Sequence, residues 1–175
     1  MSTHRFFGYG SLVNRATQDY PVVGRATLHG WRRVWRSTSL REMAYLSVRP
    51  DTSCDIHGLM ADVPDGDWRA LDIRETGYDR QPATTSLGAA QVYEVPERNF
   101  VGAEWGILLS YLDVVVQGYL REFGEEGVAQ FFATTDGWTH IHNDRENPIY
   151  PRSQVLTKDE TALVDHWLSK VQILA

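Results

Sequence analysis

The apolar residues change their spacing near the middle of the chain, and this change constrains the fold more than any other feature. In the first half they alternate with polar residues in short stretches bounded by Gly and Pro, which is typical of β-strands and turns. In the second half they recur at helical intervals. Since the strands come first and the helices later, the sequence predicts an α+β fold rather than alternating strands and helices.

The first half predicts several short strands and one helix. The strands are expected over residues 5–7, 22–34, 44–48, 55–63 and 89–95, with 22–34 bent or divided at its glycines. Arg49-Pro50-Asp51 has the composition of a turn between two of these strands. Residues 67–76 are expected to be helical, because their apolar side chains would anchor one face and Gly77 is a typical C-terminal stop.

The second half predicts three helices and one long loop. Residues 103–123 are apolar on most sides, as in a buried central helix, and a short helix is expected over residues 125–133. Residues 157–171 begin with the Thr-Lys-Asp-Glu pattern of a capping box and carry apolar residues on one face. Residues 137–154 show little periodicity, and ordered loops of this length are usually functional.

Length and charge exclude several classes of protein. A chain of 175 residues is expected to form one domain over residues 1–175. The 17 Lys and Arg residues against 23 Asp and Glu leave a net charge of −6, so the basic surface of a nucleic-acid-binding protein is not expected. Cys54 is the single cysteine, and neither a leader peptide nor a membrane-spanning stretch is recognisable. We therefore expect a cytoplasmic protein without internal disulfides.

A glycine-containing turn, Gly8-Tyr9-Gly10-Ser11-Leu12, follows the first expected strand. The two glycines allow a tight turn and a close approach of the backbone to a ligand. Consecutive N–H groups in such a turn can form a concave anion-binding site. An ordinary strand-ending turn would have the same composition. The turn matches neither the P-loop nor the dinucleotide-binding motif, since Val13 stands where the latter needs glycine.

The expected helix at 67–76 contains candidate acid–base residues. Asp72 and Glu75 are three residues apart and would share one face. Ile73 lies among charged residues, which indicates that this end of the helix is partly buried, and a buried carboxylate becomes more basic. The alternative is a solvated helix with Arg74 and Glu75 on its surface.

Tyr111 and a pair of histidines are weaker candidates. Tyr111 lies seven residues before Gly118 in the apolar helix, where a tyrosine is either a core residue or a binding group at the helix edge. His140 and His142 would share one face of a strand, but no third histidine is close in sequence, so no metal site is predicted. Ser11 is not predicted to be a catalytic serine, because no nucleophile-elbow motif surrounds it.

Taken in order along the chain, these features resemble the γ-glutamylcyclotransferase superfamily, nearest to its bacterial and ChaC-like members. The resemblance rests on Phe7-Gly8-Tyr9-Gly10-Ser11-Leu12, on Arg74-Glu75 before Gly77-Tyr78, and on Tyr111 with Gly118. The run from Gly30 to Thr38 also resembles the family's second strand region, and residues 143–168 resemble bacterial relatives rather than animal enzymes.

The resemblance implies a mixed, barrel-like β-sheet with flanking helices. It also implies an enzyme that cyclises a γ-glutamyl group to 5-oxoproline and releases an amine or amino acid. Glu75 matches the catalytic glutamate, Tyr9-Gly10-Ser11-Leu12 the substrate-binding loop, and Tyr111 a substrate-contacting tyrosine. No metal or other cofactor is implied. The expected partner is a small γ-glutamyl compound and neither nucleic acid nor membrane, and the sequence indicates no oligomeric state.

Two alternatives stay open at this point. The chain could be a non-enzymatic module that binds a small molecule on the same fold, or a relative specialised for one γ-glutamylated metabolite. Glu75 favours an enzyme, because binding alone needs no base. Loops, among them residues 145–153, are expected to build the pocket for the leaving group.

Overall fold

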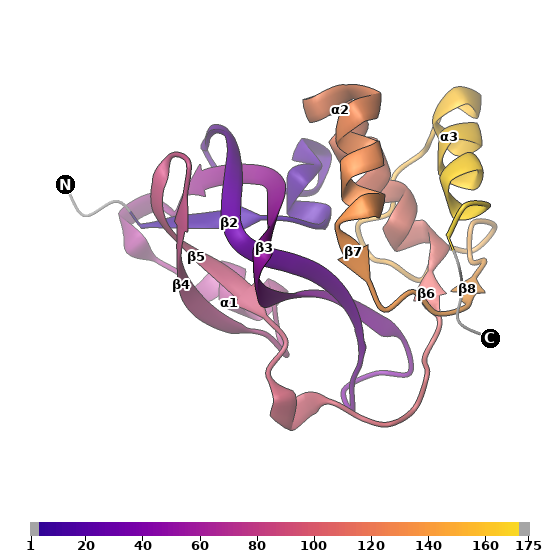
Figure 1. The fold of residues 1–175 in the computed structure, drawn as a ribbon, viewed down its shortest axis with the longest axis horizontal. Coiled ribbons are helices and arrows are strands. Elements are labelled where there is room, and N and C mark those ends of the chain that lie inside the picture. Colours follow the sequence, from indigo (N-terminus) through magenta and orange to yellow (C-terminus); the bar gives the residue numbers. More distant parts are fainter. Residues whose placement is uncertain (1–3, 172–175) are drawn as a thin grey trace.

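The strands of the first half close into a barrel in the computed structural model, which describes residues 4–171 (Figure 1). The barrel strands are β1 (Arg5–Gly8), β2 (Val22–Ser37), β3 (Ala44–Asp62), β4 (Asp79–Thr85) and β5 (Gly88–Glu94). Their order is β3-β1-β5-β4-β2, and β2 pairs again with β3, which closes the sheet. Since β1 is parallel to β5 and the other neighbours are antiparallel, the predicted mixed, barrel-like sheet is confirmed.

Three helices, four 3-10 turns and three short strands complete the fold of the described residues. The helices are α1 (Arg69–Arg74), α2 (Leu109–Ala133) and α3 (Lys158–Leu168), and four 3-10 turns span Ser11–Val13, Arg15–Thr17, Pro64–Gly66 and Glu97–Asn99. Strand β7 (Thr135–Asp136) extends the sheet beside β2, while β6 (Ile107–Leu108) pairs with β8 (Ile141–His142). Helices α2 and α3 stand side by side next to the barrel, in orange and yellow in Figure 1. None of the described helices combines the length and apolar character that a membrane crossing needs.

Helix α2 is the central helix that the apolar pattern predicts. Every residue from 112 to 119 is buried. Gly124 interrupts the helix with φ 71° and ψ −169°, at the boundary expected between the two predicted helices. The expected start at residue 103 is wrong, because Ile107 and Leu108 pair with β8 as a strand and the helix begins only at Leu109. At Gly118 an added Cβ would lie 2.7 Å from the Asn14 backbone nitrogen, so this glycine lets the loop after β1 pack against α2.

Helix α3 has the predicted N-terminus. The Thr157 hydroxyl accepts a hydrogen bond from the Glu160 backbone N–H at 3.1 Å, and the Glu160 carboxylate accepts one from the Thr157 N–H at 2.9 Å. This is a complete capping box. The predicted apolar face packs on the main core, with Val164 fully buried.

One prediction in the first half is wrong, and one strand has no counterpart in the sequence analysis. Arg49-Pro50-Asp51 is not a turn, because β3 runs through it and Pro50 lies opposite Trp31 at a shift in strand register after His29. Proline is tolerated in a sheet at such irregularities. Strand β4 is not expected from the sequence, because its inner and outer faces are not separated by apolar alternation and it contains Pro82.

Candidate active site

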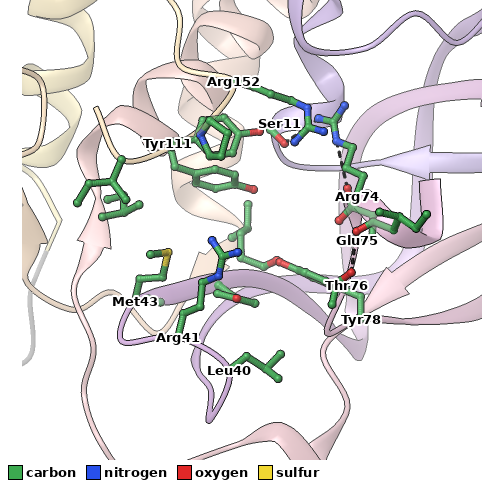
Figure 2. A pocket seen from close by; sticks show the side chains of 18 residues that line it. Ser11, Leu40, Arg41, Met43, Arg74, Glu75, Thr76, Tyr78, Tyr111 and Arg152 are labelled. Atoms are coloured by element: carbon green, nitrogen blue, oxygen red, sulfur yellow. Dashed lines mark hydrogen bonds and ion pairs between the residues drawn. The ribbon is translucent and has the colours of Figure 1, made fainter. Parts of the chain in front are cut away.

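A cavity of about 460 Å³ opens where three parts of the fold meet. One wall is the end of α1 with Ser11, a second is the start of β3 with the turn before it, and the third is Tyr111 with residues 149–152 (Figure 2). Its volume lies in the usual range for small-molecule sites. The segments that line it are far apart in the sequence, so the cavity exists only in the folded chain.

Glu75 is the single carboxylate that lines this cavity among the described residues. It lies directly after α1, where Gly77, with φ 98°, ends the helix and turns the chain into β4. Its side chain is only 15% exposed. Burial raises the pKa of Glu75, and the positive charges of Arg74 and Arg152 partly oppose this increase. A carboxylate that is made more basic by burial is suited to accept a proton.

Arg74 connects Glu75 to the loop after β1. Its Nε lies 3.4 Å from Glu75 Oε1, and another guanidinium nitrogen lies 3.3 Å from Ser11 Oγ. The same guanidinium donates to the Thr17 carbonyl at 2.5 Å and to the Thr17 hydroxyl at 3.0 Å. One guanidinium group therefore contacts both the Glu75 carboxylate and the Ser11 hydroxyl.

The loop after β1 lines a narrow inner chamber behind the main cavity. The chamber has a volume of about 20 Å³, and Glu75 and Tyr111 line both spaces. That is room for about one water-sized group. The Val13 N–H donates to the Gly10 carbonyl as the first bond of the 3-10 turn, so Ser11 and Leu12 come too early in this turn for their N–H groups to have an acceptor within it. The chamber thus combines a carboxylate with a turn whose first N–H groups the turn itself does not satisfy.

Tyr9 fixes the position of this loop within the barrel. Its side chain is 6% exposed, and its hydroxyl donates to the Tyr93 carbonyl at 2.5 Å. Its own carbonyl accepts hydrogen bonds from the buried Arg33 Nε at 3.0 Å and the Tyr119 hydroxyl at 2.8 Å. Burial raises the pKa of the Tyr9 hydroxyl well above its ordinary value, so this group stays a neutral donor.

Tyr111 points its hydroxyl from the first turn of α2 into the cavity (Figure 2). An added Cβ at Gly10 would lie 2.6 Å from this hydroxyl, so only glycine leaves room for it there. Burial, Tyr150 and Glu75 raise the pKa of Tyr111, while the Ser11 backbone and side chain oppose the increase. The tyrosine ring packs edge-on against Trp35 and Tyr150. Tyr111 therefore has a packed ring and a hydroxyl that stays protonated in the pocket.

The structure brings together the residues that the resemblance assigned to the site, but not Asp72. Glu75, Tyr111 and the four residues Tyr9–Leu12 line the inner chamber. Asp72 points elsewhere, since its carboxylate accepts from the Tyr93 hydroxyl at 2.7 Å and pairs with Arg80 at 3.0 Å. The expectation that this end of the helix is partly buried is confirmed, since the side chains of Arg74 and Glu75 are 8% and 15% exposed, but Ile73 itself is 74% exposed.

Tyr78, Arg41 and Arg152 also line the cavity, although none of them was assigned a role from the sequence. Tyr78 donates from its hydroxyl to the Leu46 carbonyl at 2.8 Å and stacks on Tyr45. Arg41 comes from the turn between β2 and β3, and Arg152 from the loop before α3. The position of Tyr78 beside the Glu75 motif was a usable signal, and Arg152 lies in the loop 145–153 that was expected to line the pocket. Nothing in the sequence indicated Arg41.

The described residues contain no group of three or more His, Cys, Asp or Glu side chains placed to hold a metal ion. His140 and His142 flank Ile141 at strand β8, and both are exposed. Neither histidine lines the cavity.

The fold is a closed mixed barrel, and its cavity contains a buried glutamate beside a glycine-containing loop. Comparison with known proteins identifies the family that has this fold. The family model described as gamma-glutamyl cyclotransferase, AIG2-like, matches residues 6–106. The chain belongs to this family and is an enzyme of the γ-glutamyl cyclotransferase type. The match includes Glu75 and the loop after β1 and ends before Tyr111. Family membership implies a small γ-glutamyl compound as substrate.

Solved structures share the fold at low sequence identity. A protein titled gamma-glutamyl cyclotransferase is 12% identical, with a TM-score of 0.58 over 94% of this chain and 99% of that chain. An uncharacterized human protein is also 12% identical, with a TM-score of 0.60 and the same coverage. A yeast gamma-glutamyl cyclotransferase specific to glutathione is 15% identical, with a TM-score of 0.50 over 98% of each chain. No curated protein matches the sequence. At these identities the structural likeness shows the fold alone.

Proposed function

We propose that this enzyme converts a γ-glutamyl amino acid, peptide or amine to 5-oxoproline and the released amine, with Glu75 as the general acid and base. The observation that carries the proposal is the buried Glu75 carboxylate, which faces both the cavity and the inner chamber formed by the loop after β1. Because burial raises the pKa of Glu75, this group is a better proton acceptor than an exposed glutamate.

The reaction needs a base at the α-amino group of the substrate. This amine is mostly protonated at neutral pH, and Glu75 would take one proton so that the nitrogen can attack its own γ-carbonyl carbon. A carbon–nitrogen bond forms and closes the five-membered ring. The ring nitrogen, which is positively charged after the attack, releases a second proton to water. The original amide bond then breaks, and Glu75 returns the proton that it took to the leaving nitrogen. Because nucleophile and carbonyl belong to one molecule, much of the entropic cost of the reaction is absent.

The loop after β1 would bind the negative charge of the substrate. The backbone N–H groups of Ser11 and Leu12 are suited either to the oxyanion that develops on the γ-carbonyl or to the α-carboxylate. The inner chamber of about 20 Å³ is large enough for one such oxygen. The Tyr111 hydroxyl, which points into the same space, would donate one further hydrogen bond.

Three narrower expectations remain predictions of this proposal: a single domain over residues 1–175, a cytoplasmic location, and a closest relationship to bacterial and ChaC-like members. A relative specialised for one γ-glutamylated metabolite is included in the proposed reaction.

The test is release of 5-oxoproline, measured by chromatography, from γ-glutamylalanine, glutathione and a γ-glutamylalkylamide. We expect turnover of at least one compound by the purified protein and equal amounts of 5-oxoproline and released amine. Heat-inactivated protein provides the control for spontaneous cyclisation. If none of the compounds gives 5-oxoproline above that control, the proposed reaction is wrong.

A further inference from the structure

Two arginines in the cavity differ from all others in the described part of the chain. Every other arginine there has its guanidinium in a hydrogen bond, an ion pair or a stack on an aromatic ring. Arg41 and Arg152 have no such partner, although 23 acidic residues are available in the sequence. Both line the same cavity.

The two unpaired arginines approach the cavity from opposite sides. Figure 2 shows Arg152 reaching in from the loop before α3, toward Ser11 and Arg74, while Arg41 reaches in from the turn between β2 and β3. The charge of Arg152 acts on Glu75, and the charge of Arg41 acts on Tyr45. The two guanidinium groups therefore lie at different ends of one cavity.

The cavity as a whole is positive in an acidic protein. Its charged lining residues are three arginines and one glutamate, whereas the chain has a net charge of −6. Unpaired cations in a concave site favour an anionic ligand, and Arg is suited to carboxylates because its planar guanidinium can bind both oxygens. Charge complementarity of this kind determines which ligand is accepted.

We infer that Arg41 and Arg152 bind the two carboxylates of a γ-glutamyl amino acid or peptide, and that γ-glutamyl amines without the second carboxylate are poor substrates. This inference rests on the proposed function. If Glu75 takes a proton from the α-ammonium group, the α-carboxylate on the same carbon lies within a few bonds of Glu75, where Arg152 is. The leaving group then extends toward the other side of the cavity, where Arg41 meets its carboxylate.

The assignment also separates the roles of two groups at the reacting end. With the α-carboxylate on Arg152, the N–H groups of Ser11 and Leu12 are available for the oxyanion. Arg41 determines substrate specificity, because it contacts the leaving group and not the reacting atoms.

A matched pair of substrates tests this inference. γ-Glutamylalanine and γ-glutamylisopropylamide have the same shape, but a methyl group replaces the alanine carboxylate in the second compound. We expect the unchanged enzyme to prefer the first compound by about tenfold to hundredfold in kcat/KM, as for a charge-assisted hydrogen bond. Arg41→Gln should remove most of this preference. Arg152→Gln should raise KM for both compounds to a similar extent.

Arg69→Gln is the control variant. Arg69 pairs with Asp67 outside the cavity, and its side chain is 87% exposed, so the variant removes the same charge without touching the site. It should leave both kcat/KM values within about twofold, given that surface ion pairs contribute little. Thermal melting checks that all three variants fold.

The inference is overturned if the unchanged enzyme turns over both compounds within threefold, or if Arg41→Gln keeps the preference. Absence of 5-oxoproline from both compounds would instead reject the proposed function. In that case calorimetric binding of the same pair still tests the inference, since equal Kd values for the two compounds would reject it as well.

Discussion

The inner and outer walls of the cavity are held in place by different means. The inner wall, formed by Glu75 and the loop after β1, is tied into the barrel: Arg74 links it to Ser11 and Thr17, and Tyr9 hydrogen-bonds across the sheet. The outer wall at residues 149–152 has no regular secondary structure, and Ile149 within it is 50% exposed.

Polar side chains hold the outer wall, together with the edge-on contact between the Tyr150 and Tyr111 rings. The Asp144 carboxylate accepts hydrogen bonds from the Ser110 N–H at 2.8 Å, the Ser110 hydroxyl at 2.5 Å and the Ile149 N–H at 2.8 Å. Arg145 forms a two-point ion pair with Asp113, with both distances 2.8 Å, and a third contact with Asp165. The family match covers the inner wall but stops before the outer one. The difference is that the wall with Glu75 belongs to the barrel that the family shares, whereas the wall at residues 149–152 is a loop held by a few charged groups.

The largest effect is expected at the inner wall. Glu75→Gln keeps the shape of the side chain but removes the base, so 5-oxoproline formation should fall by about 10²–10⁴-fold with an unchanged melting temperature. The measurement is kcat for γ-glutamylalanine. Asp72→Asn is the matched control, because Asp72 lies on the same helix but faces Tyr93 and Arg80 outside the cavity. A Glu75 variant within threefold of the unchanged enzyme would remove this residue from the mechanism.

The next effect is expected at the outer wall. Asp144→Ala leaves the buried donors of Ser110 and the part-buried Ile149 N–H without an acceptor, and should lower the free energy of unfolding by roughly 1.5–3 kcal/mol. Because the same bonds position residues 149–152, KM should rise more than kcat falls. Denaturant unfolding and steady-state kinetics measure the two effects, with the exposed Asp19→Ala as control. Lost stability with an unchanged KM would show that this anchor does not position the outer wall.

A smaller effect is expected where the two walls meet. Tyr111→Phe should weaken substrate binding by about one neutral hydrogen bond, roughly 0.5–1.5 kcal/mol, while leaving Glu75 in place. It should therefore raise KM with little change in kcat, in contrast to Glu75→Gln. A core tyrosine without a binding role would give the opposite result, in which stability falls and the kinetics stay the same.

The pH dependence of activity tests whether Arg152 of the outer wall changes the pKa of Glu75 on the inner wall. Glu75 must be deprotonated to act as a base, so kcat/KM should fall as the pH drops through its pKa. Burial raises the pKa of Glu75 above its ordinary value of 4.5, so activity is lost at a higher pH than an exposed glutamate would give. Arg152→Gln removes a cation that opposes this increase, and should move the acidic limb to still higher pH. An unmoved limb would show that Arg152 does not act on Glu75.

Removal of metal ions by a chelator should change neither activity nor stability. EDTA is expected to leave kcat and the melting temperature unchanged, because the described residues offer no group of three or more metal-ligating side chains. A loss of activity that a divalent ion restores would reassign His140 and His142 as metal ligands.

Local patterns in the sequence determine much of this protein. The order of strands and helices gives the α+β class, the capping box marks the start of α3, and the break at Gly124 appears where the glycine interrupts the apolar repeat. Local pattern alone left Asp72 and Glu75 both open, and the resemblance to the γ-glutamylcyclotransferase superfamily selected Glu75 and the loop with Ser11 as site candidates.

Only the tertiary structure decided how these parts meet. The run through Pro50 is a strand because β2 lies opposite it, and the pairing of β6 with β8 moves the start of α2 to Leu109. Burial of Glu75 comes from distant loops and not from its own helix, where Ile73 is exposed. Arg41 and Arg152 are 111 positions apart and carry no motif. Whether such an arginine is paired with an acid or left facing a cavity depends on long-range contacts, and these arise only when the barrel closes and the segment before α3 packs against α2.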